Sequence, residues 1–189
     1  NPMREPLLTE RLLLRDCTEA DAPLLFALDH DPEVMRAVGP PPADDVACYR
    51  DRIRSVYEPY QAHPWHGVRL VSCRRSDRFL GWVFLRPAPA SRDAEAFGWR
   101  DPREEEIGYR YLPEAWGRGI ATEAARALLR MALADPATSA VVAAARSGNV
   151  RSRRVLGKLG LVPTRSVTLP GVDGPIVTFT LTRQDDGGW

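Results

Sequence analysis

The stretch from residue 105 to residue 145 constrains the fold most, because it switches from one periodicity to another and back. Between Ala121 and Leu133, apolar residues recur at spacings of three and four with charged residues on the other side, which predicts an amphipathic helix. Residues 105–112 before it are typical of a strand. The small apolar run at 139–145 after it suits a strand buried on both faces. We therefore expect a sheet with helices packed on it.

Further elements follow the same two patterns. Strands are expected at residues 7–15, 68–71, 79–85, 162–169 and 176–181. Helices are expected at 22–28, after an N-cap signal at Thr18, and at 44–57 and 149–159, while 86–103 forms one long connection. The order β-α-α-β-β-β-α-β-α-β-β predicts an α+β fold with a mixed sheet of about seven strands and helices on its faces.

Length and charge limit the classes of protein that remain. With 189 residues the chain is predicted to form one domain over 1–189. A formal net charge of +1 gives no global electrostatic case for a nucleic-acid or anionic-membrane partner. No apolar run approaches a membrane span, and the first residues contain no signal-peptide core. We therefore expect neither partner, and a cytoplasmic location.

The residue types that bind metals are scattered. Cys17, Cys48 and Cys73 form no C-x-x-C pair and are odd in number, so free thiols are expected rather than disulfides or a zinc site. His63 and His66 flank a turn-like Pro-Trp pair, and we expect them on the surface or in a substrate loop. No metal cofactor is predicted.

A glycine-rich loop stands directly before the clearest helix. A helix start exposes unpaired N–H groups and the positive end of the helix dipole, and Gly117 and Gly119 would let an anion approach that backbone. Arg118 adds a positive charge. An ordinary helix start with turn glycines explains the same residues. The dinucleotide fingerprint G-x-G-x-x-G fits poorly, because Thr122 stands where its last glycine belongs, and the P-loop pattern is absent.

Three segments together carry a resemblance to a known family. Residues 106–124, EIGYRYLPEAWGRGIATEA, resemble the acetyl-CoA-binding core of the GCN5-related N-acetyltransferases (GNAT). Residues 8–15 and 149–161 resemble the opening strand and the late N-x-x-S helix of the branch that contains the ribosomal-protein-alanine N-acetyltransferases. The resemblance covers nearly the whole chain. It implies a twisted, mostly antiparallel sheet with a splayed strand pair that binds acetyl-CoA as co-substrate.

The resemblance also assigns the cofactor-binding residues. In the family pattern R/Q-x-x-G-x-G/A, Trp116 replaces the first residue. The main chain of Tyr111 and Leu112 would contact the pantetheine arm, Asn149 would hydrogen-bond it from the far side, and Arg154 would reach the nucleotide. The backbone that would cradle the pyrophosphate comprises Gly117, Arg118, Gly119, Ile120, Ala121 and Thr122.

Basic residues gather on the two segments expected to flank this phosphate-rich ligand. They are Arg118, Arg151, Arg153, Arg154 and the solitary lysine, Lys158. Arg151 and Arg153 could instead face solvent.

The chemistry of acetylating an amine requires further groups. Only a neutral amine attacks a thioester, so a base helps, as do a donor for the oxyanion and a proton for the departing thiolate. Glu106 is the best candidate base, although it could be a surface acid in a run of three glutamates. Many relatives carry a tyrosine acid where this chain has Leu156. Ser152 is therefore predicted to serve the thiolate, unless it is a helix-surface serine, and Tyr109 and Tyr111 are alternative donors.

The acceptor would meet the acetyl group between the early helices and the strand-connecting loops. Acidic and aromatic residues in and beside segments 29–42 and 86–99 suit a cationic amine such as a protein N-terminus, an amino acid or an aminoglycoside. Two other functions remain open at this point: a CoA-binding sensor without catalysis, and transfer from another acyl-CoA such as succinyl-CoA. The resemblance also allows a homodimer.

Overall fold

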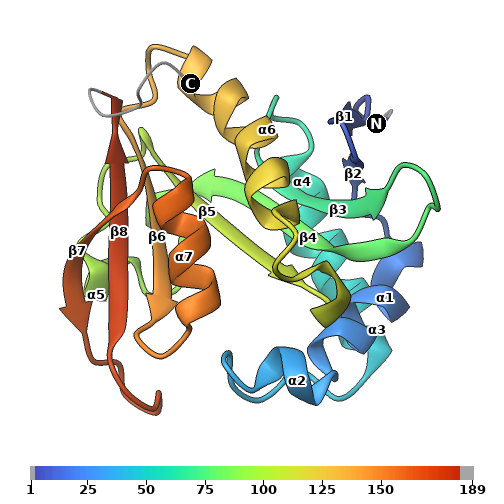
Figure 1. Ribbon diagram of the computed structural model, residues 1–189, viewed down its shortest axis with the longest axis horizontal. Coiled ribbons are helices and arrows are strands. Elements are labelled where there is room, and N and C mark those ends of the chain that lie inside the picture. The colour runs from blue at the N-terminus through green and yellow to red at the C-terminus, as the bar shows by residue number, and fades with distance from the viewer. Residues whose placement is uncertain (1–2, 184–189) are drawn as a thin grey trace.

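The computed structural model describes residues 3–183, which build one eight-stranded sheet (Figure 1). Its strand order is β1-β2-β3-β4-β5-β6-β8-β7. Every neighbouring pair in this described sheet is antiparallel except β5 and β6, which are parallel. The strands are β1 (Leu7–Leu8), β2 (Leu12–Asp16), β3 (Gly67–Cys73), β4 (Phe79–Pro87), β5 (Glu104–Tyr111), β6 (Ala140–Arg146), β7 (Val162–Val167) and β8 (Ile176–Thr182).

The first expected strand, residues 7–15, is instead two strands, which raises the strand number from about seven to eight. The turn between β1 and β2 is closed by the Thr9 amide, which donates to the Leu12 carbonyl at 2.9 Å. Glu123 holds this turn from outside, because its carboxylate accepts from the Thr9 hydroxyl and the Arg11 amide. The turn residues include neither glycine nor proline, so the sequence contains no turn signal there.

The helices fall close to the expected segments, with shorter turns added. The four expected helices are α1 (Ala22–Asp29), α3 (Val46–Arg52) with its continuation η2 (Ile53–Tyr57), α6 (Ile120–Ala134) and α7 (Val150–Lys158). The connection at 86–103 has local structure, which the sequence reasoning did not expect. The added turns are η1 (Glu19–Asp21), α2 (Pro32–Met35), α4 (Glu58–Tyr60), η3 (Ala88–Ala90), α5 (Ala94–Phe97) and η4 (Pro113–Ala115).

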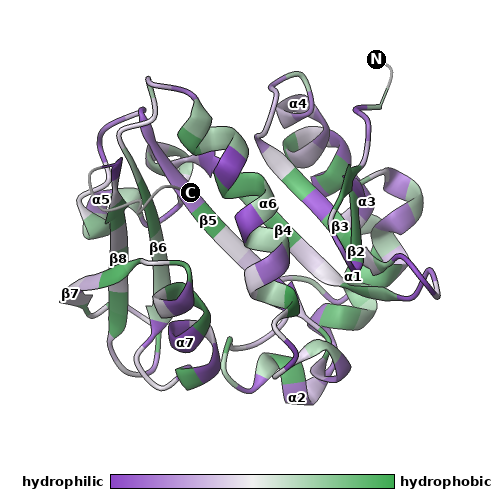
Figure 2. Cartoon of the chain, turned by 45° about the horizontal axis from the view of Figure 1, so that its top comes forward, coloured by the Kyte–Doolittle hydropathy of each residue, from purple (hydrophilic) through white to green (hydrophobic). Residues whose placement is uncertain are grey.

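Side-chain alternation along the strands builds a separate apolar core on each face of the sheet. On one face, called here the α6 face, Leu85 and Ile107 pack with Leu128 of α6. On the opposite, α1 face, Val68 and Leu70 pack with residues of α1 and α3. Figure 2 shows hydrophilic and hydrophobic residues alternating along α6, as one-sided burial requires. Helices thus cover both faces.

Strands β5 and β6 separate after a short paired stretch. They pair only from Glu104 opposite Ala140 to Glu106 opposite Val142. Beyond that point β5 continues beside β4, and β6 continues beside β8 as far as Arg146. Figure 1 shows the two strands starting side by side and diverging toward α2. This is the splayed pair that the resemblance led us to expect.

Candidate active site

A cleft of about 870 Å³ opens where β5 and β6 diverge. Its walls come from β4, β5 and β6, from the loop leading into α6, from α7, from α2 and from the segment around α5. Of the twelve site residues predicted from sequence, ten line this cleft, and they come from three separate segments of the chain. The ten are Glu106, Tyr111, Gly117, Gly119, Ile120, Ala121, Thr122, Asn149, Ser152 and Arg154.

The other two predicted residues, Leu112 and Arg118, do not line the cleft. Leu112 packs beside the small core around Leu28, and its amide donates to the Leu80 carbonyl at 2.8 Å. Arg118 is exposed, and its guanidinium donates to the Glu114 carbonyl at 3.3 Å. The cofactor contacts of these two residues stay predictions.

Tyr111 contributes to the cleft in a way the sequence did not indicate. Its carbonyl accepts a hydrogen bond from the indole N–H of Trp116 at 3.0 Å, so that part of its main chain is already used. The Tyr111 hydroxyl is buried and has no partner within residues 3–183. Burial raises the pKa of this phenol well above its usual range, so it stays protonated.

The start of α6 has two glycines and open N–H groups, which are the features that an anion site requires. Gly119 is the N-cap residue, with a φ of 75° that favours glycine, and Gly117 has a φ of 71°. No side chain caps the helix, so its first N–H groups stay open at the positive end of a fifteen-residue dipole. A Cβ at Gly117 would meet nothing within 4 Å, so this face of the loop is free to receive a ligand. An anion site at this helix start stays a prediction.

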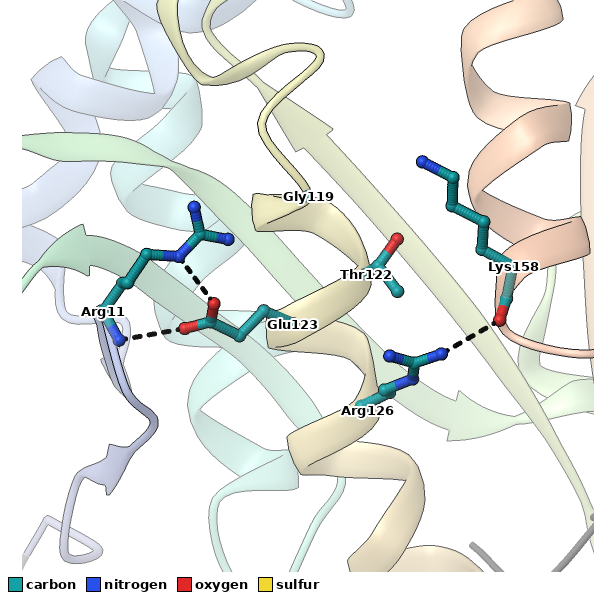
Figure 3. A pocket seen from close by; sticks show the side chains of 6 residues that line it. All are labelled: Arg11, Gly119, Thr122, Glu123, Arg126 and Lys158. Carbon is teal, nitrogen blue, oxygen red and sulfur yellow. Dashed lines mark hydrogen bonds and ion pairs between the residues drawn. The ribbon is translucent and has the colours of Figure 1, made fainter.

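A second, smaller pocket of about 360 Å³ adjoins this helix start. Figure 3 shows Arg11 and Lys158 on opposite sides of the first turn of α6, near Gly119. The guanidinium of Arg11 is paired with Glu123 at 2.7 Å. The ammonium of Lys158 has no hydrogen bond or ion pair with any described residue. The ammonium of Lys158, the one lysine of the chain, is therefore available to bind an anionic ligand beside the cleft.

Helix α7 forms the wall opposite α6. Asn149 is its N-cap, because its Oδ1 accepts from the Ser152 amide at 3.2 Å, which leaves the amide NH₂ group to serve the cleft. Arg151 lies across the ring of Trp116, with Cζ 3.6 Å from the ring centroid. This cation–π contact joins α7 to the loop before α6. Arg151 is exposed, which was one of its alternatives, and its guanidinium also lies against the tryptophan that departs from the family pattern.

Two hydroxyl groups meet between β5 and α7. The Tyr109 hydroxyl lies 3.0 Å from the Ser152 carbonyl, to which it donates, and 3.1 Å from Ser152 Oγ. Burial raises the pKa of Tyr109 above its usual range, and the bond to Ser152 opposes that rise. Ser152 is thus part of a half-buried hydroxyl pair, which disfavours its reading as a plain helix-surface serine.

Glu106 lies on the α1 face at the point where β5 and β6 part. Only 6% of the residue is exposed, so it is not a surface acid. Arg86, its cross-strand partner on β4, donates to both carboxylate oxygens at 2.8–3.1 Å. Burial raises the pKa of Glu106, while the Arg86 charge and hydrogen bonds lower it, and the net direction is upward. A carboxylate with a raised pKa is a stronger base than an ordinary glutamate.

The neighbouring Glu105 points to the opposite face. Its carboxylate accepts from the indole N–H of Trp65 at 3.1 Å and contacts Nε2 of His66 at 2.9 Å. His66 is buried and stacks on His63, with ring centroids 3.6 Å apart. The expectation of a surface or substrate-loop histidine pair is therefore wrong for His66, because β5, which β4 separates from β3 in the sheet, supplies a buried acid that sequence spacing cannot reveal.

Arginine side chains lie over aromatic rings in the part of the cleft on the α1 face, called here the α1-face half. Trp82 and Phe84 stack with centroids 5.6 Å apart, and the Arg86 guanidinium lies over the Phe84 ring. Arg110 lies over Trp82 and is paired with Asp29 at 2.6 Å. The wall combines flat apolar surface with charges that are already neutralised.

Asp93 adds an uncompensated acid to this half. It lines the cleft on the segment before α5, and its proximity contributes to the raised pKa of Glu106. Its carboxylate has no hydrogen-bond or ion-pair partner within residues 3–183. Such a group suits a cationic ligand. In the same described residues no cluster of His, Cys, Asp and Glu is arranged to hold a metal, and no helix has the length and apolarity to cross a membrane.

Comparison with known proteins identifies the family. A family model described as an acetyltransferase (GNAT) domain matches residues 11–162, which is most of the chain. The chain belongs to the GNAT acetyltransferase family. It is an acetyl-CoA-dependent N-acetyltransferase, with acetyl-CoA as co-substrate.

Individual relatives of this acetyltransferase agree with that assignment. It is 29% identical to FsC-acetyl coenzyme A-N(2)-transacetylase of Aspergillus fumigatus over 94% of this chain and 76% of that protein. It is 29% identical to the uncharacterized N-acetyltransferase YoaA of Bacillus subtilis over 80% of each. Among solved structures, a GNAT-family acetyltransferase of Bacillus anthracis shares its fold, with a TM-score of 0.74, 17% identity and coverage of 95% and 99% of the two chains. An aminoglycoside acetyltransferase AAC(6')-Ib, solved in complex with coenzyme A, also shares the fold, with a TM-score of 0.69 and 23% identity. The match covers 92% of this chain and 96% of that one.

Several lining residues of the acetyltransferase were not singled out from its sequence. The role of Arg86 follows from strand register, which places it opposite Glu106. Arg151 and Trp116 are far apart in the sequence, so local patterns could not predict their contact. The one signal was that Trp116 replaces the first residue of the family pattern. Arg146 lines the cleft at the end of β6 and carried no sequence signal beyond a charge that ends an apolar run.

Proposed function

We propose that this enzyme transfers the acetyl group of acetyl-CoA to a primary amine that is cationic in solution, by direct attack within a ternary complex. The observation that carries the proposal is the position of Glu106, a buried carboxylate at the apex of the splayed strands. One end of the same cleft offers an uncapped helix start for phosphate, and the α1-face half offers an acid and aromatic rings for an amine.

The cofactor would lie between α6 and α7. The backbone from Gly117 to Thr122 would hold the pyrophosphate, since open N–H groups and glycines favour an anion there. The amide NH₂ of Asn149 would donate to the pantetheine arm. The nucleotide end would extend toward the smaller pocket, where Lys158 supplies a free positive charge for a further phosphate.

The proton balance assigns roles to three side chains. The acceptor binds as an ammonium ion and loses a proton to Glu106, directly or through water. Its neutral nitrogen then forms a bond to the thioester carbonyl carbon, the C–S bond breaks, and the second proton leaves the nitrogen for solvent, which gives the amide and CoA thiolate. The thiolate takes up a proton through the hydroxyl pair of Ser152 and Tyr109, which lies on the α7 side of the cleft.

Arg86 would position the base. Its three hydrogen bonds hold the Glu106 carboxylate in one orientation, while burial keeps the pKa of that carboxyl above its ordinary value. Asp93 would attract the ammonium form of the acceptor to the same place. Holding amine and thioester together supplies much of the rate enhancement of such reactions.

An acceptor screen tests this function. The purified enzyme is incubated with acetyl-CoA and a panel of amines, release of free CoA thiol is followed, and products are identified by mass. We expect acetylated amine, with kcat for Glu106→Gln reduced about 100-fold or more. Binding of CoA without release of thiol would instead identify a sensor, and turnover only with succinyl-CoA would identify another acyl donor. A Glu106→Gln rate within a few-fold of wild type would refute the base assignment.

A protein N-terminus is the acceptor class that the ribosomal-protein-alanine resemblance suggests, and small amines are the class suggested by the relatives. Peptides and small amines both belong in the screen.

A homodimer and a cytoplasmic location stay predictions. Light scattering of the purified protein tests the homodimer.

A further inference from the structure

Arg146 is an uncompensated cation in the α1-face half of the cleft. Arg86 and Arg110, which β4 and β5 contribute to the same half, are each neutralised by a carboxylate. Those carboxylates belong to Glu106 at 2.8 Å and Asp29 at 2.6 Å. The guanidinium of Arg146 has no ion pair or hydrogen bond with any residue that the structure describes, yet it lines the cleft.

Strand register places this charge on the acceptor side. Val142 is the β6 residue opposite Glu106, and alternate residues of a strand share a face, so Ala144 and Arg146 lie on that face too. A Cβ at Gly39 would lie only 2.9 Å from Nη2 of Arg146. The guanidinium therefore reaches from β6 to the loop after α2, where the cleft meets solvent.

The distance along β6 limits what this charge can bind. Arg146 lies four residues beyond Val142, which is about 13 Å along a strand at the usual rise per residue. Even with the flexible stem of the arginine bent back, several bonds must separate an amine beside Glu106 from a group beside Arg146. Asp93 lies close enough to affect the pKa of Glu106, so opposite free charges stand at the two ends of this half.

We propose that the acceptor is an amino-acid-like compound whose primary amine is separated by several bonds from a carboxylate, and that Arg146 binds the carboxylate. The proposal rests on the acetyltransferase function proposed above and names its substrate class. Guanidinium groups pair with carboxylates through two parallel hydrogen bonds, which makes arginine the usual partner for that group. A ligand carrying only amines would bring positive charge toward Arg146, and a free α-amino acid is too short to reach both ends.

Matched pairs of acceptors test the proposal. ε-Aminocaproate and its amide carry the same amine, and peptides with free or amidated C-termini provide further pairs. We expect the wild-type enzyme to use the acid with a kcat/KM about 10- to 100-fold higher than the amide, mainly through KM, as for one charge-assisted hydrogen-bonded pair. In Arg146→Gln the preference should disappear while the amide is used as before, and Arg146→Lys should retain part of it.

Glu33→Gln is the matched control. Glu33 is an exposed, unpaired charge of opposite sign on α2 in the same half, so its removal should leave the preference for acids intact or larger. The affinity for CoA and the unfolding temperature should not change in any of the three variants. If amines are acetylated but acids are never preferred, or if Arg146→Gln keeps the preference, the proposal is overturned and the proposed function stands. If no amine in any pair releases CoA, the proposed function itself has failed.

Discussion

Replacing Gly108 with alanine should damage the acceptor side of the cleft selectively. Gly108 lies directly opposite Phe84 in the β4–β5 ladder. A Cβ at position 108 would lie 2.4 Å from both Cε1 and Cζ of the Phe84 ring, whereas carbon atoms in contact are about 3.5–4.0 Å apart. The ring must therefore move by roughly 1 Å or more, and its displacement disturbs the stacking on Trp82 and the contact with Arg86.

The free-energy cost follows from the two ways of relieving this contact. Separating β4 from β5 would break backbone hydrogen bonds along a long ladder, so the half-buried ring should move instead. Overpacking of this kind typically costs about 1–3 kcal/mol of folding free energy. We expect denaturant unfolding of Gly108→Ala to show a loss in that range. The acceptor KM should rise, whereas the dissociation constant of acetyl-CoA should not change, because the start of α6 is untouched.

Two other glycines provide matched controls. A Cβ at Gly148, which also lines the cleft, or at Gly157 of α7 would meet nothing within 4 Å, and neither residue has a left-handed φ. Gly148→Ala should leave the acceptor KM unchanged. Gly157→Ala should stabilise the protein by up to about 1 kcal/mol, because alanine favours a helix interior over glycine. If Gly108→Ala matches these controls in stability and KM, the reasoning from the Phe84 contact is refuted.

Three further outcomes follow from other contacts. The pKa of Glu123 is lowered by hydrogen bonds from Thr9 and Arg11, which outweigh burial, so its stabilising effect is present at neutral pH and is lost as pH falls through the lowered value. Glu123→Gln should thus cost about 1–2 kcal/mol at neutral pH and show a smaller acid-induced loss than wild type in urea titrations. Because the pKa of Glu106 is raised, kcat should begin to fall at a higher pH, on acidification, than it would with an ordinary glutamate as base. Glu106→Gln should abolish this acid limb of the pH profile of kcat. An unchanged limb in that variant would contradict the base assignment. Lys158→Ala should weaken binding of CoA roughly two- to fivefold in calorimetry, as for an exposed charge pair. The affinity for dephospho-CoA should not change. Equal losses for both ligands would exclude a contact between Lys158 and the additional phosphate of CoA.

Local patterns in the sequence were sufficient for much of the fold. The amphipathic period around Leu128 and the apolar run ending at Ala145 both predicted their elements, since each reflects burial of a continuous face. The hairpin at Thr9 was missed because its turn is held by Glu123, more than a hundred residues away. Propensity cannot report a contact made by so distant a residue.

The candidate site divides in the same way. Gly117 and Gly119 stood out locally because glycines before a helix let an anion approach its open N–H groups, whereas the cofactor-binding loop through Thr122 followed from the family resemblance and stays a prediction. The run of three glutamates was ambiguous in sequence. Only the register of β5 puts Glu106 beside Arg86 on one face and Glu105 beside His66 on the other. Pairings across strands decide which acid is available for chemistry, and they depend on the folded sheet.

The brevity of the β5–β6 pairing has a consequence for the cohesion of the protein. Backbone pairing between strands β1–β5 and strands β6, β8 and β7 is confined to three residue pairs. Buried residues of α6 pack in the apolar core that covers one face of both parts. Past those pairs, two sheet edges face one another inside a single molecule, where a second protein chain cannot readily reach them. A ligand with amide groups that lies between these edges would act as a missing strand. The unfolding temperature of this enzyme should therefore follow the concentration of its acyl donor as it would follow that of a subunit.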